Sequence, residues 1–146
     1  MSIFRLFMQQ LFSFIRRLNS SRLFPTIWSV FTIALLCIPG KAIPGLGLFG
    51  IKHIDKLAHF VLFGGFVLCW GIYSSGKTKS PQRWKLSLII ITLISFIIGV
   101  IMEFVQVNFI PNRSFDNWDI VADLVGSLFV WQLLVHYGKR WNLLLW

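Results

Sequence analysis

The sequence predicts an all-α, polytopic membrane protein in which an amphipathic interfacial helix precedes a bundle of four transmembrane helices. Hydrophobic residues make up 56% of the 146 residues and charged residues only 13%, and the mean hydropathy is +0.74. A soluble domain of this size lacks the polar surface to cover so apolar a chain. The apolar residues gather in four long runs, and each run should be a helix because lipid leaves a single segment no other way to satisfy its backbone.

Residues 1–22 form an amphipathic N-terminal segment that we expect to lie on the membrane surface. Between Ser2 and Leu18 the apolar residues recur with a helical period, and the polar residues lie elsewhere. The apolar side comprises Ile3, Phe4, Phe7, Leu11, Phe14 and Leu18, and the remainder includes Arg5, Gln9, Ser13, Arg16 and Arg17. A cleaved signal peptide is the competing interpretation. The segment lacks a basic start followed by an uninterrupted apolar core and a small-residue cleavage site, so we expect it to be retained.

Residues 23–146 hold the four spans of the bundle. The spans run from Phe24 to Pro39, from Leu57 to Tyr73, from Leu86 to Phe104 and from Ile120 to Tyr137. A helix needs about 20 residues to cross a hydrocarbon core of about 30 Å. The first two spans are on the short side of this length.

The distribution of Lys and Arg predicts that both termini are cytoplasmic. Ten of the 14 basic residues lie before the first span, between the second and third spans, and after the fourth. Basic loops stay on the cytoplasmic side, so we expect a multi-pass protein of the cell (cytoplasmic or inner) membrane. The net charge of +9 then indicates anionic membrane lipids, and not nucleic acid, as the neighbours of these residues.

All five acidic residues fall in two short stretches at the edges of the spans. Asp55 lies in one stretch, and Glu103, Asp116, Asp119 and Asp123 lie in the other. An ionisable group next to a long apolar segment is costly unless something requires it. The predicted topology brings both stretches to the outer face, where they can form one site.

Helical spacing indicates which side chains can converge at this outer face. Residues three or four apart share a helix face, which pairs Asp55 with His59 and Glu103 with Gln106. If the fourth span begins near Asp116, its three aspartates form one stripe. The residues expected together are Asp55, His59, Glu103, Gln106, Arg113, Asp116, Asp119 and Asp123. Small residues continue the two stripes inward and predict close helix contacts; they are Ser95, Gly99, Gly126 and Ser127.

These motifs resemble the VanZ-like family of bacterial membrane proteins. The pattern is Asp-Lys-x-x-His at 55–59, Glu-x-x-Gln at 103–106, Arg113, Asp116, and Asp-x-x-x-Asp-x-x-Gly at 119–126. The similarity covers residues 25–137, and the positions that match are Asp55, Lys56, His59, Glu103, Gln106, Arg113, Asp116, Asp119 and Gly126. The resemblance implies a cell-envelope function and low-level resistance to the glycopeptide antibiotic teicoplanin, without naming a biochemical activity. Asp123 departs from the pattern, because family members often carry Asn there.

The residue types suggest three kinds of role. Candidate catalytic residues are Asp55, His59, Glu103, Arg113 and Asp119, with His59 as acid or base. Candidate binding residues are Lys56, Gln106, Arg113 and Asp116, with Arg113 placed to grip a phosphate. Candidate metal ligands are Asp116, Asp119, Asp123 and Glu103, because carboxylate oxygens suit Mg2+ or Mn2+. The corresponding function is a metal-dependent enzyme acting on a phosphate-bearing envelope lipid.

Other interpretations stay open beside the enzyme. The same site could bind a head group, a glycopeptide or a proton without catalysis, with Glu103 as the proton carrier. His59 could be a hydrogen-bonded interfacial residue, Glu103 an ion-pair partner of Arg113 or Lys56, and Asp116 a helix cap. The bundle could also dock other membrane proteins as a non-catalytic assembly partner.

The expected partners are membrane lipids and either a lipid-linked cell-wall intermediate or a glycopeptide. Four short helices bury limited surface, which is compatible with an oligomer. Cys37 and Cys69 should lie at different depths, which argues against a disulfide between them.

Overall fold

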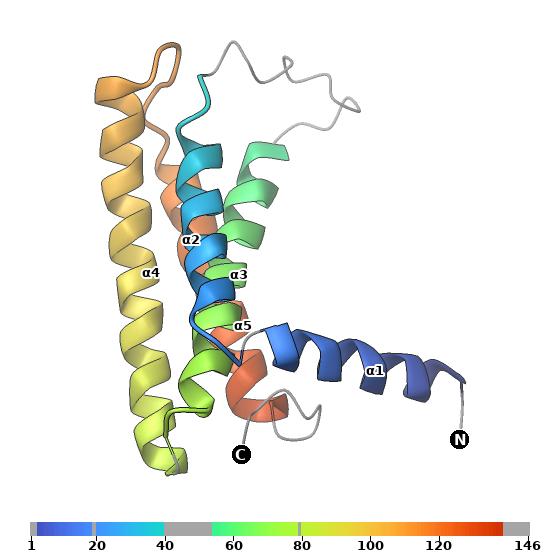
Figure 1. Cartoon of the computed structure of the whole chain (residues 1–146). Coiled ribbons are helices and arrows are strands. Elements are labelled where there is room, and N and C mark those ends of the chain that lie inside the picture. Colours follow the sequence, from blue (N-terminus) through green and yellow to red (C-terminus); the bar gives the residue numbers. More distant parts are fainter. Residues whose placement is uncertain (1–2, 19, 40–53, 79, 139–146) are drawn as a thin grey trace.

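The computed structural model describes residues 3–18, 20–39, 54–78 and 80–138, and in these ranges the chain is all-α without a strand. The helices are α1 (Ile3–Leu18), α2 (Leu23–Leu36), α3 (Ile54–Ser75), α4 (Pro81–Phe109) and α5 (Asn117–Tyr137). Helices α2 to α5 run side by side as a bundle, whereas α1 projects sideways from the end at which α2 begins (Figure 1). The predicted fold class is therefore confirmed as all-α. The basic residues Lys41, Lys52, Lys79, Lys139 and Arg140 lie outside the described ranges.

Three of the helices, α3, α4 and α5, are long and apolar enough to cross a membrane. Helix α2 coincides with the first predicted span but ends at Leu36 and has 14 residues. With a rise of about 1.5 Å per residue it is about 21 Å long, shorter than a hydrocarbon core of about 30 Å.

Local sequence explains where α4 and α5 begin. Ser80 precedes α4, its hydroxyl accepts a hydrogen bond from the Arg83 amide, and Pro81 occupies the first helical turn. Asp116 precedes α5, and its carboxylate accepts a hydrogen bond from the amide of Trp118 at 2.8 Å. Both side chains satisfy amides that have no partner within the helix. The fourth predicted span, Ile120 to Tyr137, lies in a helix that begins at Asn117, so the condition for one stripe of three aspartates is met, and the suggested role of Asp116 as a helix cap is confirmed.

The bundle core divides into two apolar clusters. One is formed by α3, α4 and α5 and contains Phe66, Val67, Ile72, Trp84, Leu88 and Leu134. The other lies nearer the start of α3 and contains Leu36, Leu62, Phe63 and Met102. Large apolar side chains also cover the outside of the bundle, for example Ile90, Leu93 and Ile97 on α4. Apolar surface of this extent indicates contact with lipid.

Small residues allow the helices to approach closely, as predicted. A Cβ added at Gly126 on α5 would collide with the backbone of Phe60 on α3. A Cβ at Gly65 would collide with the indole of Trp28, whose Nε1–H donates to the carbonyl of Leu62 at 3.0 Å. These contacts fix α3 between α2 and α5. Cys37 and Cys69 are free thiols.

Candidate functional site

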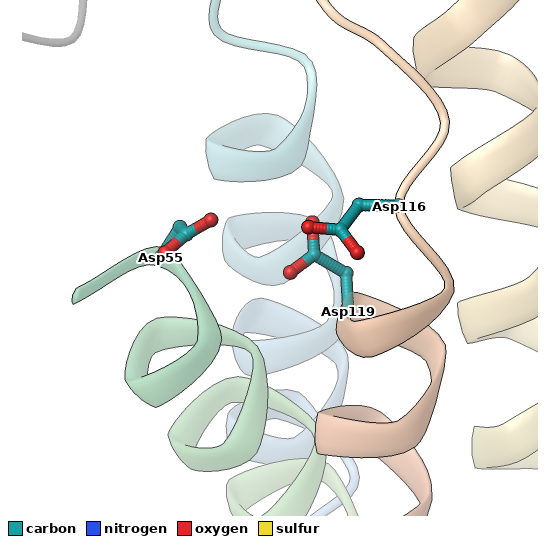
Figure 2. A group of neighbouring side chains, drawn as sticks. All are labelled: Asp55, Asp116 and Asp119. Atoms are coloured by element: carbon teal, nitrogen blue, oxygen red, sulfur yellow. The ribbon is translucent and has the colours of Figure 1, made fainter. Parts of the chain in front are cut away.

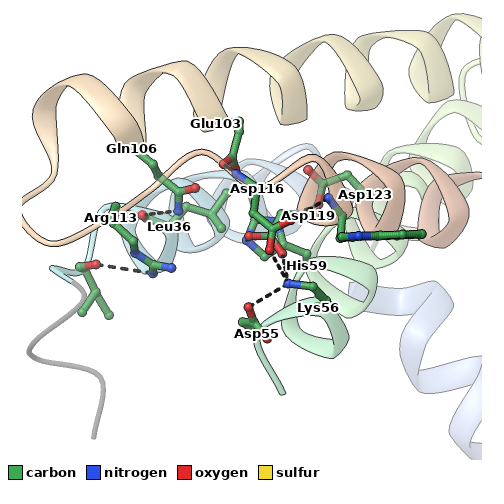
Figure 3. A network of polar contacts seen from close by, with 12 residues as sticks. Leu36, Asp55, Lys56, His59, Glu103, Gln106, Arg113, Asp116, Asp119 and Asp123 are labelled. Carbon is green, nitrogen blue, oxygen red and sulfur yellow. Dashed lines mark hydrogen bonds and ion pairs between the residues drawn. The ribbon is translucent and has the colours of Figure 1, made fainter. Parts of the chain in front are cut away.

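Nine polar side chains meet at one end of the bundle, where α3 and α5 begin and α4 ends (Figure 3). We call them the polar cluster: Asp55, Lys56, His59, Glu103, Gln106, Arg113, Asp116, Asp119 and Asp123. Glu103 is 2% exposed, Asp119 6% and Asp123 1%. The structure thus brings together every residue that the sequence singled out for a site. Their pairing differs from the predicted one in several places.

Lys56 lies at the centre of three carboxylates. Its Nζ is 3.1 Å from Asp55 Oδ2, 2.6 Å from Asp116 Oδ2 and 3.2 Å from Asp119 Oδ1. An ammonium group has three donors, so each carboxylate takes one of them. Lys56 was predicted to bind a ligand. In the structure its ammonium group forms ion pairs with the three carboxylates at the N-terminal ends of α3 and α5.

The three carboxylates are also the described group that most resembles a metal site. Asp55, Asp116 and Asp119 each offer an oxygen within 4.8 Å of the others (Figure 2). The donor type suits Mg2+ or Mn2+, but the Lys56 ammonium lies within 3.2 Å of one oxygen of each carboxylate and would repel a second cation there. The arrangement therefore does not fit a metal ion while Lys56 keeps its position. The set also differs from the predicted ligands, because Asp55 takes part and Glu103 and Asp123 do not.

Asp123 instead pairs with His59 deeper in the bundle. His59 Nδ1 and Asp123 Oδ1 are 2.9 Å apart, and both side chains are almost fully buried. The imidazole lies nearly parallel to the ring of Phe63, with centroids 6.3 Å apart and planes inclined by 13°. The other ring nitrogen, Nε2, faces Asp119 Oδ2 at 3.9 Å, which is too long for a hydrogen bond. The alternative of a hydrogen-bonded His59 is consistent with this contact, and the side chain is 4% exposed.

Glu103 connects the end of α4 to the start of α5. Its carboxylate accepts a hydrogen bond from the backbone amide of Asp116. The suggested ion pair of Glu103 with Lys56 or Arg113 is absent from the described part of the chain. A backbone amide satisfies the carboxylate instead, because the turn before α5 folds back over the last turns of α4.

Gln106 and Arg113 contact the end of α2. The Gln106 amide donates to the carbonyl of Leu36 at 2.8 Å, and Arg113 Nη2 donates to the carbonyl of Ile38 at 3.5 Å. Arg113 follows Asn112, whose φ of 59° is a left-handed conformation that Asn tolerates. Both side chains thus satisfy orphan carbonyls at a helix end. Sequence reasoning could not find these partners, because a backbone carbonyl carries no residue signature.

A second polar layer lies beneath the His59–Asp123 pair. The hydroxyls of Ser95 and Ser127 are 2.9 Å apart and fully buried. Gly99 leaves room for Asp123, since a Cβ at this position would approach the Asp123 carboxylate to 2.5 Å. The predicted inward continuation of the two polar stripes is therefore present.

Comparison with known proteins adds one finding. A family model described as VanZ/LLP1 matches residues 2–138, which include all five helices of the described ranges and the whole polar cluster. No match is found among curated proteins or among solved structures.

Proposed function

Because this chain belongs to the VanZ/LLP1 family, we propose that its polar cluster is an outward-facing site for a cell-envelope function, including resistance to teicoplanin. One observation carries this proposal. All five acidic residues of the chain converge from three helices and the turn before α5, and three of them are buried in an otherwise apolar bundle. Charged groups inside a membrane bundle are costly and generally mark function.

The proposed topology has four spans, both termini in the cytoplasm, and α1 on the membrane surface. Leu6, Phe7, Leu11 and Phe14 of α1 are exposed, and α1 leaves the bundle at the end opposite the polar cluster (Figure 1). A helix with this apolar side suits the boundary between head groups and acyl chains, and its arginines suit anionic lipids. The short α2 then starts where α1 lies in the interface.

Cysteine labelling tests this topology. In a chain without Cys37 and Cys69, Ser114→Cys next to the polar cluster should react with a membrane-impermeant maleimide in intact cells. Gln82→Cys at the start of α4 should react only after lysis, because both side chains are exposed but lie at opposite ends of the bundle. Phe14→Cys should react more slowly than Ser13→Cys after lysis, because lipid covers it. Labelling of Gln82→Cys in intact cells would reverse the proposed orientation.

Teicoplanin susceptibility tests the function. A host expressing the wild-type chain should tolerate more teicoplanin than a host with an empty vector. Asp119→Ala and Glu103→Ala should return the inhibitory concentration to the empty-vector value, because each removes a buried carboxylate from the polar cluster. Arg113→Ala should have the same effect, because it removes the hydrogen bond from Arg113 to the carbonyl of Ile38 after α2.

The matched control is Gln132→Ala, an exposed position on α5 far from the polar cluster, and every variant is compared at equal membrane abundance. Full protection by Asp119→Ala and Glu103→Ala would show that the cluster is structural. A wild-type chain that gives no protection would remove the antibiotic role.

A metal-dependent enzyme acting on a phosphate-bearing envelope lipid is the second candidate function. The three carboxylate oxygens within 4.8 Å of one another favour it. It requires Lys56 to move away from these oxygens, and it uses Arg113, which has further N–H donors besides the one that reaches the carbonyl of Ile38, to bind the phosphate. We place it second for this reason, and varying divalent metal in the susceptibility assay separates the two functions.

A further inference from the structure

In the buried pair of His59 and Asp123, only one ring nitrogen of His59, Nδ1, is within hydrogen-bond distance of a carboxylate. We propose that Asp123 is a positioning residue that holds the Nδ1–H of His59, so that Nε2 becomes the proton-accepting group of the polar cluster for an O–H or N–H of the ligand. This inference rests on the proposed function, because it assumes that the cluster receives a ligand.

The two distances distinguish the roles of the neighbouring carboxylates. Asp123 Oδ1 is within hydrogen-bond distance of Nδ1 at 2.9 Å, whereas Asp119 Oδ2 is 3.9 Å from Nε2. An ionised carboxylate only accepts hydrogen bonds. With Asp123 ionised and the ring neutral, the proton between His59 and Asp123 resides on Nδ1, and Nε2 presents a lone pair.

The two carboxylate oxygens of Asp119 have different neighbours. Lys56 donates to Asp119 Oδ1 at 3.2 Å, which leaves Oδ2 facing the imidazole. A single donor group can lie about 2.8 Å from each of two acceptors that are 3.9 Å apart. A ligand hydroxyl, amine or water in this position would donate to Nε2 of His59 beside the ion pair of Lys56 and Asp119.

Packing holds the pair in this orientation. The Phe63 ring lies nearly parallel to the imidazole with centroids 6.3 Å apart, and the absence of a side chain at Gly99 leaves room for the Asp123 carboxylate beside α4. A carboxylate that fixes one nitrogen of a histidine is a general way to set the tautomer of the ring. An amide oxygen at position 123 could accept the same Nδ1–H.

Nitrogen NMR of the full chain in detergent micelles tests the positioning role directly. With ¹⁵N-labelled histidine at pH 8, the wild type should show a protonated, pyrrole-type Nδ1 and an unprotonated, pyridine-type Nε2 for His59. The signal is assigned by its loss in His59→Gln. Asp123→Leu should lose this tautomer, and Asp123→Asn should retain it. A wild-type spectrum with the proton on Nε2, or the same tautomer in Asp123→Leu, would overturn the proposal.

Teicoplanin susceptibility of the same variants separates this inference from the proposed function. Protection should be lost in His59→Gln and Asp123→Leu and largely retained in Asp123→Asn. If the NMR result holds and all three variants protect fully, the proposed function fails and the base has no ligand to act on. Loss of protection in Asp123→Asn with an unchanged tautomer would show that the charge of Asp123 matters and its positioning does not, which contradicts the inference.

Discussion

Gly126→Ala is expected to destabilise the bundle by about 1–3 kcal/mol, the usual cost of overpacking a well-packed interface. A Cβ at this position would overlap the carbonyl oxygen, carbonyl carbon and Cα of Phe60. Backbone atoms cannot rotate away as a side chain can, so α3 and α5 must separate. Phe60 adjoins His59, and Gly126 lies three residues after Asp123, so the separation should also lengthen the His59–Asp123 contact.

Gly71→Ala is the matched control for this prediction. A Cβ there would meet the terminal methyl groups of Leu134 and Leu88 at 2.6 and 2.9 Å, and these flexible ends can move. Both substitutions gain the same helix propensity, about 1 kcal/mol, so their difference isolates the backbone clash. Unfolding in mixed micelles of SDS and a mild detergent, followed by circular dichroism, measures it. Equal stability of the two variants would show that the α3–α5 contact tolerates a wider spacing.

Lys56→Gln is expected to create a divalent-cation site that the wild type lacks. The substitution removes the ammonium and leaves Asp55, Asp116 and Asp119 with oxygens within 4.8 Å of one another. Their mutual repulsion should destabilise the variant, and Mn2+ should restore stability because it prefers carboxylate oxygens. At a Mn2+ concentration of one hundred times Kd, the gain is about 2.7 kcal/mol.

Electron paramagnetic resonance of free Mn2+ and the melting temperature of the purified chain measure this effect. The wild type and Lys56→Arg should show neither saturable binding nor a shift in melting temperature, because both retain a cation among the carboxylates. Lys56→Gln should bind one ion, and adding Asp119→Asn should weaken the binding at least tenfold. Saturable binding by the wild type that depends on Asp119 would instead support the metal-dependent enzyme.

Periodicity and hydropathy predicted much of the architecture because both depend on local chemistry. The apolar runs located α2 to α5 to within a few residues at most ends, and a helix cap was one of the roles considered for Asp116, whose carboxylate accepts a hydrogen bond from the Trp118 amide. The largest difference is at α4, which extends from Pro81, directly after the N-cap Ser80, to Phe109, because the terminal turns with Gln82, Arg83, Gln106 and Asn108 also adopt helix. Hydropathy does not detect polar helical turns.

The grouping of the acidic residues also followed from the sequence. Helical spacing placed Asp119 and Asp123 on one face, and the topology brought that face to the same end of the bundle as Asp55 and His59. The motifs from Asp55 to Gly126 identified the family, which the match over residues 2–138 shows.

Only the tertiary structure decided which of these side chains contact one another. Lys56 forms ion pairs with three carboxylates, Asp123 pairs with His59, and Glu103 accepts a hydrogen bond from a backbone amide. The sequence by itself determined the helices and the faces on which the polar residues lie, because a helix relates residues three and four apart. The rotation and depth of one helix against another depend instead on contacts between distant residues, such as Gly126 against the Phe60 backbone. A shift of one helical turn in that contact would give the same polar residues different partners.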